Sequence, residues 1–117
     1  MKYVFLFCGT REQQRAWESL SGDARERAYA RVGQWFEEHR SKISGGNQLA
    51  PPSTATTVRP QDNGTAPLVT DGPFMEGNEV IGGYVEVEVP DMDEALRMAK
   101  SWPAGPVEIR PVITMGM

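Results

Sequence analysis

The chain has 117 residues, a hydrophobic content of 39%, a charged content of 24% and a formal net charge of −4. This length suits a single domain over residues 1–117, which can bury roughly 65% of its unfolded surface without staples. The single cysteine excludes an internal disulfide framework, and the apolar start is too short for a membrane span, so cytoplasmic residence is expected.

The charges are unevenly distributed along the chain. Eight acidic residues and no Lys or Arg lie between residues 71 and 94, whereas the bases cluster between residues 11 and 42 and are mixed with acids. No segment forms a basic stripe, so direct binding of nucleic acid is not expected.

Residues 2–8 (KYVFLFC) predict a β-strand, because they are rich in β-branched and aromatic side chains. Both alternating sets are apolar: Tyr3, Phe5 and Phe7 on one face, and Val4, Leu6 and Cys8 on the other. A strand that is apolar on both faces is covered on both faces. Helices of the same chain would cover one face. A second copy of the sheet is the simplest cover for the other, which predicts a two-fold homodimer.

A helix in two pieces is predicted next. Thr10 and Gln13 form a capping box at the start of a short helix, and a longer helix follows over about residues 23–43. Apolar positions recur at spacings of three and four in the longer helix, at Ala28, Val32, Trp35, Phe36, His39 and Ile43. Gly45 and Gly46 are expected to end it.

The middle of the chain predicts three strands. Residues 54–59 (TATTVR) and 67–70 (PLVT) indicate a hairpin around Asn63-Gly64, followed by a loop over residues 71–78. Residues 83–89 (GYVEVEV) then alternate cleanly. The inward set is Val85, Val87 and Val89, and the opposite set is Tyr84, Glu86 and Glu88.

The last elements complete the pattern. Asp91 and Glu94 indicate a capped helix that ends at Pro103 and Gly105, and residues 107–114 (VEIRPVIT) indicate a strand in which Pro111 favours an edge position. The order of elements predicts an α+β, ferredoxin-like fold. Its antiparallel sheet would carry helices on one face and an inserted β-hairpin.

The most distinctive motif is Asp71-Gly72-Pro73-Phe74. Together with residues 54–59, 82–84, 89–91 and 108–112, it makes the chain resemble the YCII-related domain family, in the branch named after the DGPF motif. The resemblance implies a ferredoxin-like fold of the dimeric α/β-barrel type. It also implies a link to sigma-factor domains, which some members carry, but it supplies no general activity.

Asp71 has two interpretations. In the structural one, its carboxylate accepts a hydrogen bond from a nearby backbone N–H in an Asx-turn, and Phe74 pins the loop to the core. In the functional one, Asp71 lies at the mouth of a pocket as a general base or ligand contact, beside the binding candidates Gly72, Pro73 and Phe74. A general base there needs burial or a neighbouring like charge to raise its pKa.

His39 is the only histidine. It is either a core or interface residue satisfied by one hydrogen bond, or an acid/base partner of Asp71. Enzymatic function is suspected for the resembling family because of a His and an Asp. However, that His lies nearer the start of the first helix than His39 does, and Asp71 comes from the DGPF motif rather than from that pair.

Charged residues share the strand face opposite the valines. Glu86 and Glu88 lie there on one strand, and Glu108 and Arg110 share a face of the last strand. They either pair with one another at a solvated rim, or line a polar pocket between two subunits. Tyr84, Glu86 and Arg110 are the binding candidates on this face.

Two functions from different classes stay open. The first is a homodimeric small-molecule-binding protein or enzyme, with Asp71 and His39 as catalytic candidates. The second is a non-enzymatic interaction module associated with sigma-factor-dependent transcription initiation. No cofactor or metal is expected, because one His and one Cys cannot build a typical zinc site and nucleotide-binding glycine motifs are missing. The sequence does not decide between enzyme and non-enzyme.

Overall fold

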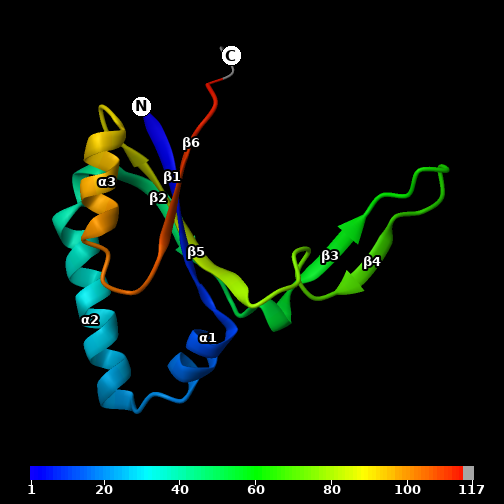
Figure 1. The fold of residues 1–117 in the computed structure, drawn as a ribbon, viewed down its shortest axis with the longest axis horizontal. Helices are drawn as coiled ribbons and strands as arrows, with labels where there is room; N and C mark the ends of the chain where they lie inside the picture. The colour runs from blue at the N-terminus through cyan, green and yellow to red at the C-terminus, as the bar shows by residue number, and fades with distance from the viewer. Residues whose placement is uncertain (115–117) are drawn as a thin grey trace.

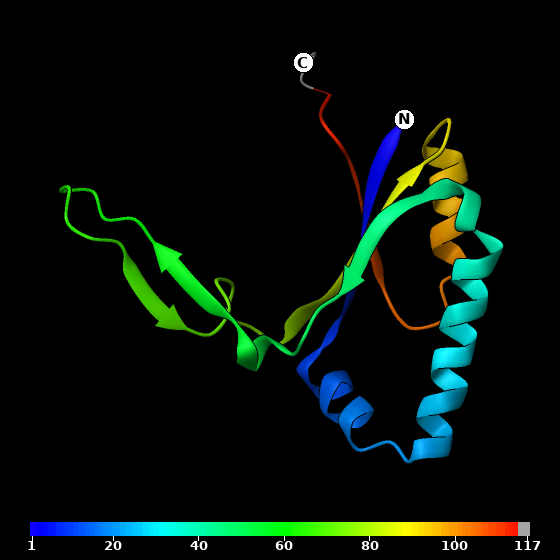
Figure 2. The same ribbon diagram turned by 180° about the vertical axis from the view of Figure 1, so that it is seen from behind.

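A computed structural model describes residues 1–114 and contains two antiparallel sheets. The larger sheet has the order β2-β5-β1-β6, with β1 (Lys2–Thr10), β2 (Ile43–Gln48), β5 (Glu79–Glu88) and β6 (Val107–Pro111). The helices α1 (Arg11–Glu18), α2 (Gly22–Glu38) and α3 (Met92–Lys100) lie on one side of it (Figures 1 and 2). This arrangement is consistent with a ferredoxin-like fold and confirms the α+β prediction. Within the described residues, none of the helices is long and apolar enough to span a bilayer.

Strand alternation determines the core. Tyr3 and Phe5 of β1 pair with Val87 and Val85 of β5, and all four side chains are buried beneath the helices. The predicted inward set of β5 is therefore confirmed. The remaining members of the core cluster are Trp35, Val89, Ala95 and Met98.

The opposite face of the sheet carries a half-buried apolar strip between charged residues. Glu86 and Arg110 lie on either side of Val4, and Tyr84 and Glu108 lie on either side of Leu6. These six residues are called the far face, because the helices lie on the other side. The predicted grouping of Tyr84 and the charged residues on one face follows from this register. β6 is an edge strand, so Pro111 occupies a position where its missing N–H costs no ladder bond.

The second helix ends earlier than the sequence predicted. α2 stops at Glu38 with His39 as its C-cap, and a 3-10 turn (Arg40–Lys42) leads into β2. Gly45 and Gly46 do not end a helix but follow a register shift in β2. Gly46 has a φ of 151°, and a Cβ there would lie 2.4 Å from the carbonyl oxygen of Tyr84. These glycines therefore permit a bulge and a close approach to β5.

The inserted hairpin is confirmed and projects from the rest of the chain. β3 (Thr56–Arg59) and β4 (Leu68–Asp71) form the second sheet, connected by residues 60–67 rather than by a two-residue turn. Residues 52–78, which include a 3-10 turn (Pro52–Thr54), are called the arm. The arm leaves the four-stranded sheet on the side opposite the helices (Figures 1 and 2). It raises the radius of gyration to 16.9 Å, against about 13 Å for a compact chain of this length.

Candidate functional site

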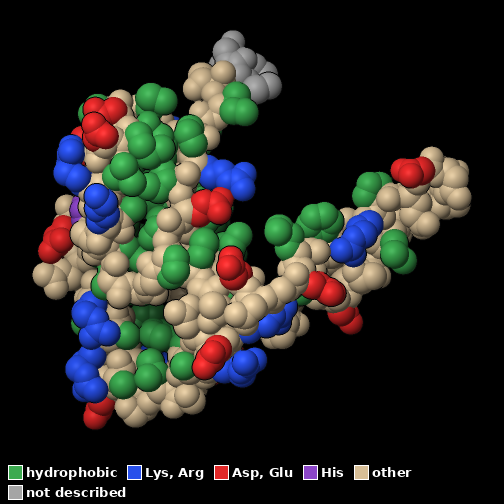
Figure 3. Space-filling view, in the orientation of Figure 1, with side chains coloured by type: hydrophobic (Ala, Val, Ile, Leu, Met, Phe, Trp, Pro, Cys, Tyr) green, Lys and Arg blue, Asp and Glu red, His purple; other side chains and the backbone are tan. Residues whose placement is uncertain are grey.

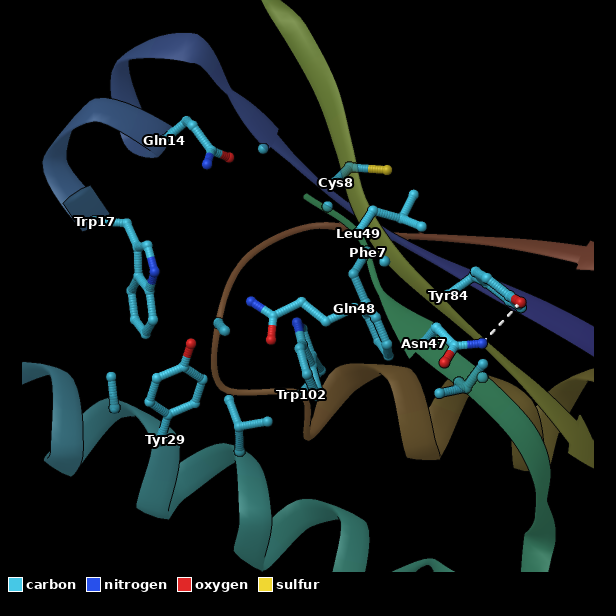
Figure 4. Close-up of a pocket in the computed structure, with 18 of the residues that line it drawn as sticks. Phe7, Cys8, Gln14, Trp17, Tyr29, Asn47, Gln48, Leu49, Tyr84 and Trp102 are labelled. Atoms are coloured by element: carbon cyan, nitrogen blue, oxygen red, sulfur yellow. Dashed lines mark hydrogen bonds between the residues drawn. The ribbon is translucent and has the colours of Figure 1, made fainter. Parts of the chain in front are cut away.

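A large open cleft lies on the helix side of the sheet, between α1, α2 and the ends of β1, β2 and β5 (Figure 4). Its volume is about 1380 Å³. Small-molecule pockets usually measure roughly 300–1,000 Å³, so a ligand of that size would occupy part of it.

Two aromatic pairs line separate parts of the cleft. Trp17 of α1 meets Tyr29 of α2 edge to face, with ring centroids 5.0 Å apart and an interplanar angle of 88°. Phe7 of β1 stacks on Trp102, with centroids 3.9 Å apart and an angle of 16°. Figure 4 shows Trp17 directed from α1 towards Tyr29, with Phe7 and Trp102 farther along the cleft. Together they offer both edges and faces of aromatic rings to a planar molecule.

Short-range contacts place Trp17. The capping box predicted for Thr10 and Gln13 is present and fixes the start of α1 directly after β1. At the other end of α1, Arg25 of α2 donates from Nη2 to the carbonyl oxygens of Trp17 and Glu18, at 3.1 and 3.0 Å. The Arg25 guanidinium also lies 5.9 Å from the centroid of the Trp17 ring. A cation at the C-terminal carbonyls of a helix stabilises that end, so Arg25 holds Trp17 against α2.

Amide side chains supply polar groups to the cleft. Gln48, at the end of β2, and Gln14, on α1, extend into it (Figure 4). Each amide can donate and accept hydrogen bonds at once. Asn47 donates instead to the Oη of Tyr84, at 3.2 Å, so its amide is already engaged.

Cys8 lies at the cleft but is not activated as a nucleophile. Burial raises the pKa of the Cys8 thiol, the nearby carboxylates of Glu108 and Glu79 raise it further, and a backbone hydrogen bond at Glu108 acts in the opposite direction. The thiol donates to the carbonyl oxygen of Leu6 at 3.3 Å. Because the thiolate is the reactive form, Cys8 stays largely unreactive near neutral pH.

We expect the Cys8 thiolate to form at higher pH in the folded chain than in the unfolded chain. The measurement is the thiolate absorbance at 240 nm against pH, with the Cys8→Ser variant subtracted to remove the tyrosine signal. Since the folded state holds this proton more tightly, the associated stability is present below the unfolded pKa and is lost as pH rises through the folded one. A folded midpoint at or below the unfolded midpoint would contradict the assignment.

The DGPF segment lies on the arm, outside the cleft, and is held by the other arm strand. The Gly72 N–H donates to the carbonyl of Ala55 at 2.8 Å, and the Thr57 hydroxyl donates to the carbonyl of Gly72 at 2.7 Å. Gly72 has a φ of 104°, which only glycine adopts readily. The TATTVR and DGPF segments therefore contact each other. Asp71 ends β4 with an exposed side chain.

Phe74 does not pin the loop to the core. Its side chain is 68% exposed, and the Arg59 guanidinium lies 5.1 Å from the ring centroid. Arg59 also donates to the Phe74 carbonyl at 3.4 Å. The arm carries the loop away from the core, so a cation–π contact within the arm takes the place of core burial.

His39 has a structural position in the single chain. As the C-cap of α2 it is half-buried, and its Nδ1 lies 2.8 Å from the Trp35 carbonyl, which can only accept, so Nδ1–H is the donor. Its ring centroid is 4.7 Å from that of Trp35. Figure 3 shows the histidine at the edge of the body opposite the arm, which carries Asp71. The structure does not bring His39 and Asp71 together within one chain.

Of the charged candidates on the strand face opposite the valines, three form ion pairs. Arg110 and Glu108 form an exposed ion pair of 2.7 Å, and Glu88 lies 3.4 Å from the N-terminal amine. Tyr84 is the one sequence-predicted binding residue among those that line the cleft in the described part of the chain, although strand alternation turns its side chain to the far face. Sequence reasoning missed Phe7, Tyr29, Gln48 and Trp102 as cleft residues. Two tryptophans outside the apolar stripe of the long helix, Trp17 and Trp102, were the available signal.

Among residues 1–114, no group of three or more His, Cys, Asp or Glu side chains is placed to hold a metal ion. Compared with known proteins, residues 1–116 match the family described as YCII-related domain. No curated protein matches the chain.

Proposed function

The chain belongs to the YCII-related domain family, and from this premise we propose that it binds a small molecule in the cleft between α1, α2 and the sheet. The observation that carries the proposal is the meeting of two aromatic pairs and two glutamine amides in one open cleft. Ligand sites are typically apolar and aromatic, with a few polar groups that fix orientation. We also propose that the chain belongs to the DGPF branch, because it carries the Asp71-Gly72-Pro73-Phe74 motif and the TATTVR segment.

The lining indicates the chemistry of the ligand. Trp17, Tyr29 and the stacked Phe7–Trp102 pair favour a planar, largely apolar molecule. Gln14 and Gln48 favour a neutral group that can both donate and accept hydrogen bonds, such as an amide, a lactam or a phenol. Arg25 uses Nη2 at the end of α1, but its buried Nε has no hydrogen-bond partner among the described residues, so an acceptor group on the ligand can also bind there.

The geometry supports binding rather than catalysis by one chain. Asp71 and His39 lie outside the cleft, and the raised pKa of Cys8 opposes nucleophilic attack. The proposal therefore assigns none of these residues a catalytic role.

We further propose a homodimer formed through the far face, in the manner of a dimeric α/β-barrel. Val4 and Leu6 are only half-buried in the single chain, and a second sheet would complete their burial. The alternative function, an interaction module beside sigma factors, draws support from the exposed apolar arm. The arm also fits a second copy of this chain.

Replacing Trp17 by alanine is expected to weaken ligand binding about 2- to 12-fold, because one aromatic contact contributes about 0.5–1.5 kcal/mol. A thermal-shift screen of neutral planar aromatics with an amide or phenol group would supply the ligand, and titration would give its Kd. Gln48→Ala should also raise the Kd of the same ligand.

The matched control for this screen is Asp71→Asn, on the arm, which should bind as the wild type does. A ligand that binds Trp17→Ala normally but not Asp71→Asn would place the site on the arm and overturn the proposal.

A further inference from the structure

The arm carries apolar side chains without a core of its own. Its exposed large hydrophobic residues are Val58 (58%), Leu68 (51%), Val69 (62%), Phe74 (68%) and Met75 (78%). Val58 and Val69 are direct partners across the two strands, so they form one continuous apolar patch. An isolated two-stranded hairpin is marginally stable in water at best. Exposed apolar patches of this kind usually mark an interface.

The arm is nevertheless held in a defined shape at its base. The contacts of Gly72 with Ala55 and Thr57, and of Phe74 with Arg59, connect its two strands where they leave the sheet. A segment that is already ordered loses little conformational entropy when it binds. The arm is therefore suited to binding as a preformed element.

The total surface of the chain exceeds that of a compact monomer. Its accessible surface is 8466 Å², whereas a compact protein of 13.0 kDa exposes about 6,300 Å². The excess is about 2,100 Å², and a standard interface buries about 800 Å² per partner. The extended shape thus leaves more surface than one stable dimer interface requires.

The arm and the far face border the same open space. The arm projects on the side of the sheet away from the helices, and the space-filling view shows a gap between it and the body (Figures 1 and 3). One occupant of this gap would contact both the half-buried Val4 and Leu6 and the arm.

The charges of the far face favour a second copy as that occupant. Glu86 lies on one side of Val4 and Arg110 on the other. A two-fold axis parallel to β1 would place Arg110 of one copy over Glu86 of the partner subunit, and the reverse. Such a face is self-complementary, as the interface of a two-fold dimer must be.

We propose that the arm binds a second copy of the chain, so that each subunit of a two-fold dimer buries the Val58–Val69 patch and Met75 against its partner. This inference rests on the proposed homodimer and adds the arm to its interface. The arm then contributes to dimer stability in addition to the far face.

The test replaces both valines of the patch by lysine. Sedimentation equilibrium from nanomolar to micromolar concentration should show a wild-type dimer, and Val58→Lys/Val69→Lys should raise its Kd about 100-fold or more. Both side chains are exposed in the single chain, so the circular dichroism spectrum should stay unchanged. Met75 lies outside β3 and β4, so Met75→Lys should also raise the dimer Kd without disturbing the strand pairing of the hairpin.

The matched control is Ala30→Lys/Gln34→Lys, which adds the same charge at two exposed positions of α2 and should leave the Kd unchanged. If the arm variants dimerise with the same Kd as the wild type and this control, the role of the arm is overturned and the far-face dimer stands. A wild type that stays monomeric throughout would overturn both, and would leave a different protein as the occupant of the gap.

Discussion

Replacing Trp35 by alanine is expected to lower the free energy of unfolding by about 3–5 kcal/mol, the range for removing a large buried aromatic side chain. Trp35 is 3% exposed. Its ring lies 5.0 to 6.5 Å, between centroids, from the rings of Phe5, Phe7, Phe36 and Trp102. Deleting it leaves a cavity where α2, α3 and the sheet meet.

The hydrogen bonds of Trp35 add to this cost. Its Nε1 donates to the Met98 carbonyl at 3.1 Å and to the Ser101 hydroxyl at 3.0 Å, which joins α2 to the end of α3. Trp35→Phe keeps most of the packing but removes these hydrogen bonds, so it should lower the free energy of unfolding by about 1–3 kcal/mol. The two variants together separate the packing of the ring from its polar contacts.

Urea unfolding at one fixed protein concentration measures both variants, because dimerisation would make stability depend on concentration. Gln34→Ala, at the exposed neighbouring position of α2, is the control and should change stability by less than about 0.5 kcal/mol. A loss of under about 1 kcal/mol for Trp35→Ala would show that this residue is not the centre of the core. Because Trp35 supports Phe7 and Trp102, the alanine variant should also lose ligand binding.

Replacing Gly46 by alanine is expected to lower the free energy of unfolding by about 2–4 kcal/mol. Its φ of 151° is strained for any side chain, and a Cβ would lie 2.4 Å from the Tyr84 carbonyl oxygen and 2.8 Å from the Val85 Cα. Both obstacles belong to the backbone of β5, so the clash can be relieved only by moving a strand. The expected result is a less stable β2–β5 pairing and a distorted cleft.

Gly33→Ala is the matched control with the opposite expected sign. Gly33 lies inside α2, where a Cβ would meet no described atom within 4 Å other than its neighbours and the backbone of its own helix. Alanine at a helical position of this kind is favoured over glycine by about 1 kcal/mol. Equal effects of the two substitutions in thermal or urea unfolding would refute the close approach at Gly46.

Much of the fold was predictable because local rules specify it. Period-two alternation placed Tyr3, Phe5, Val85 and Val87 on one face, and the Thr10 capping box marked the start of α1. The end of α2 was not predictable in this way, because Ile43 continues the helical spacing although it begins β2. Pairing with Val87 in the sheet outweighed the local pattern.

The candidate site was largely hidden in the sequence. In the DGPF motif, the φ of 104° at Gly72 and its contacts with Ala55 and Thr57 restrict the backbone. The motif therefore reflects a turn and not a pocket. Tyr84 was the sequence-predicted binding residue among those that line the cleft, although its side chain lies on the far face. The Asp71–His39 pairing required a proximity that the projecting arm prevents in one chain.

The strand alternation and the helix starts could be read from the amino-acid sequence, since each depends on residues a few positions apart. The hairpin could be read because residues 60–67 alone separate its two strands. The tertiary structure alone decided that Trp17 meets Tyr29, that Phe7 stacks on Trp102 and that the arm leaves on the far side of the sheet. Those placements depend on strand register, on the bulge at Gly45 and Gly46, and on the path of the chain between sheets. The physical reason is that contacts between distant segments are fixed by the packing of whole elements, which no short stretch of residues encodes.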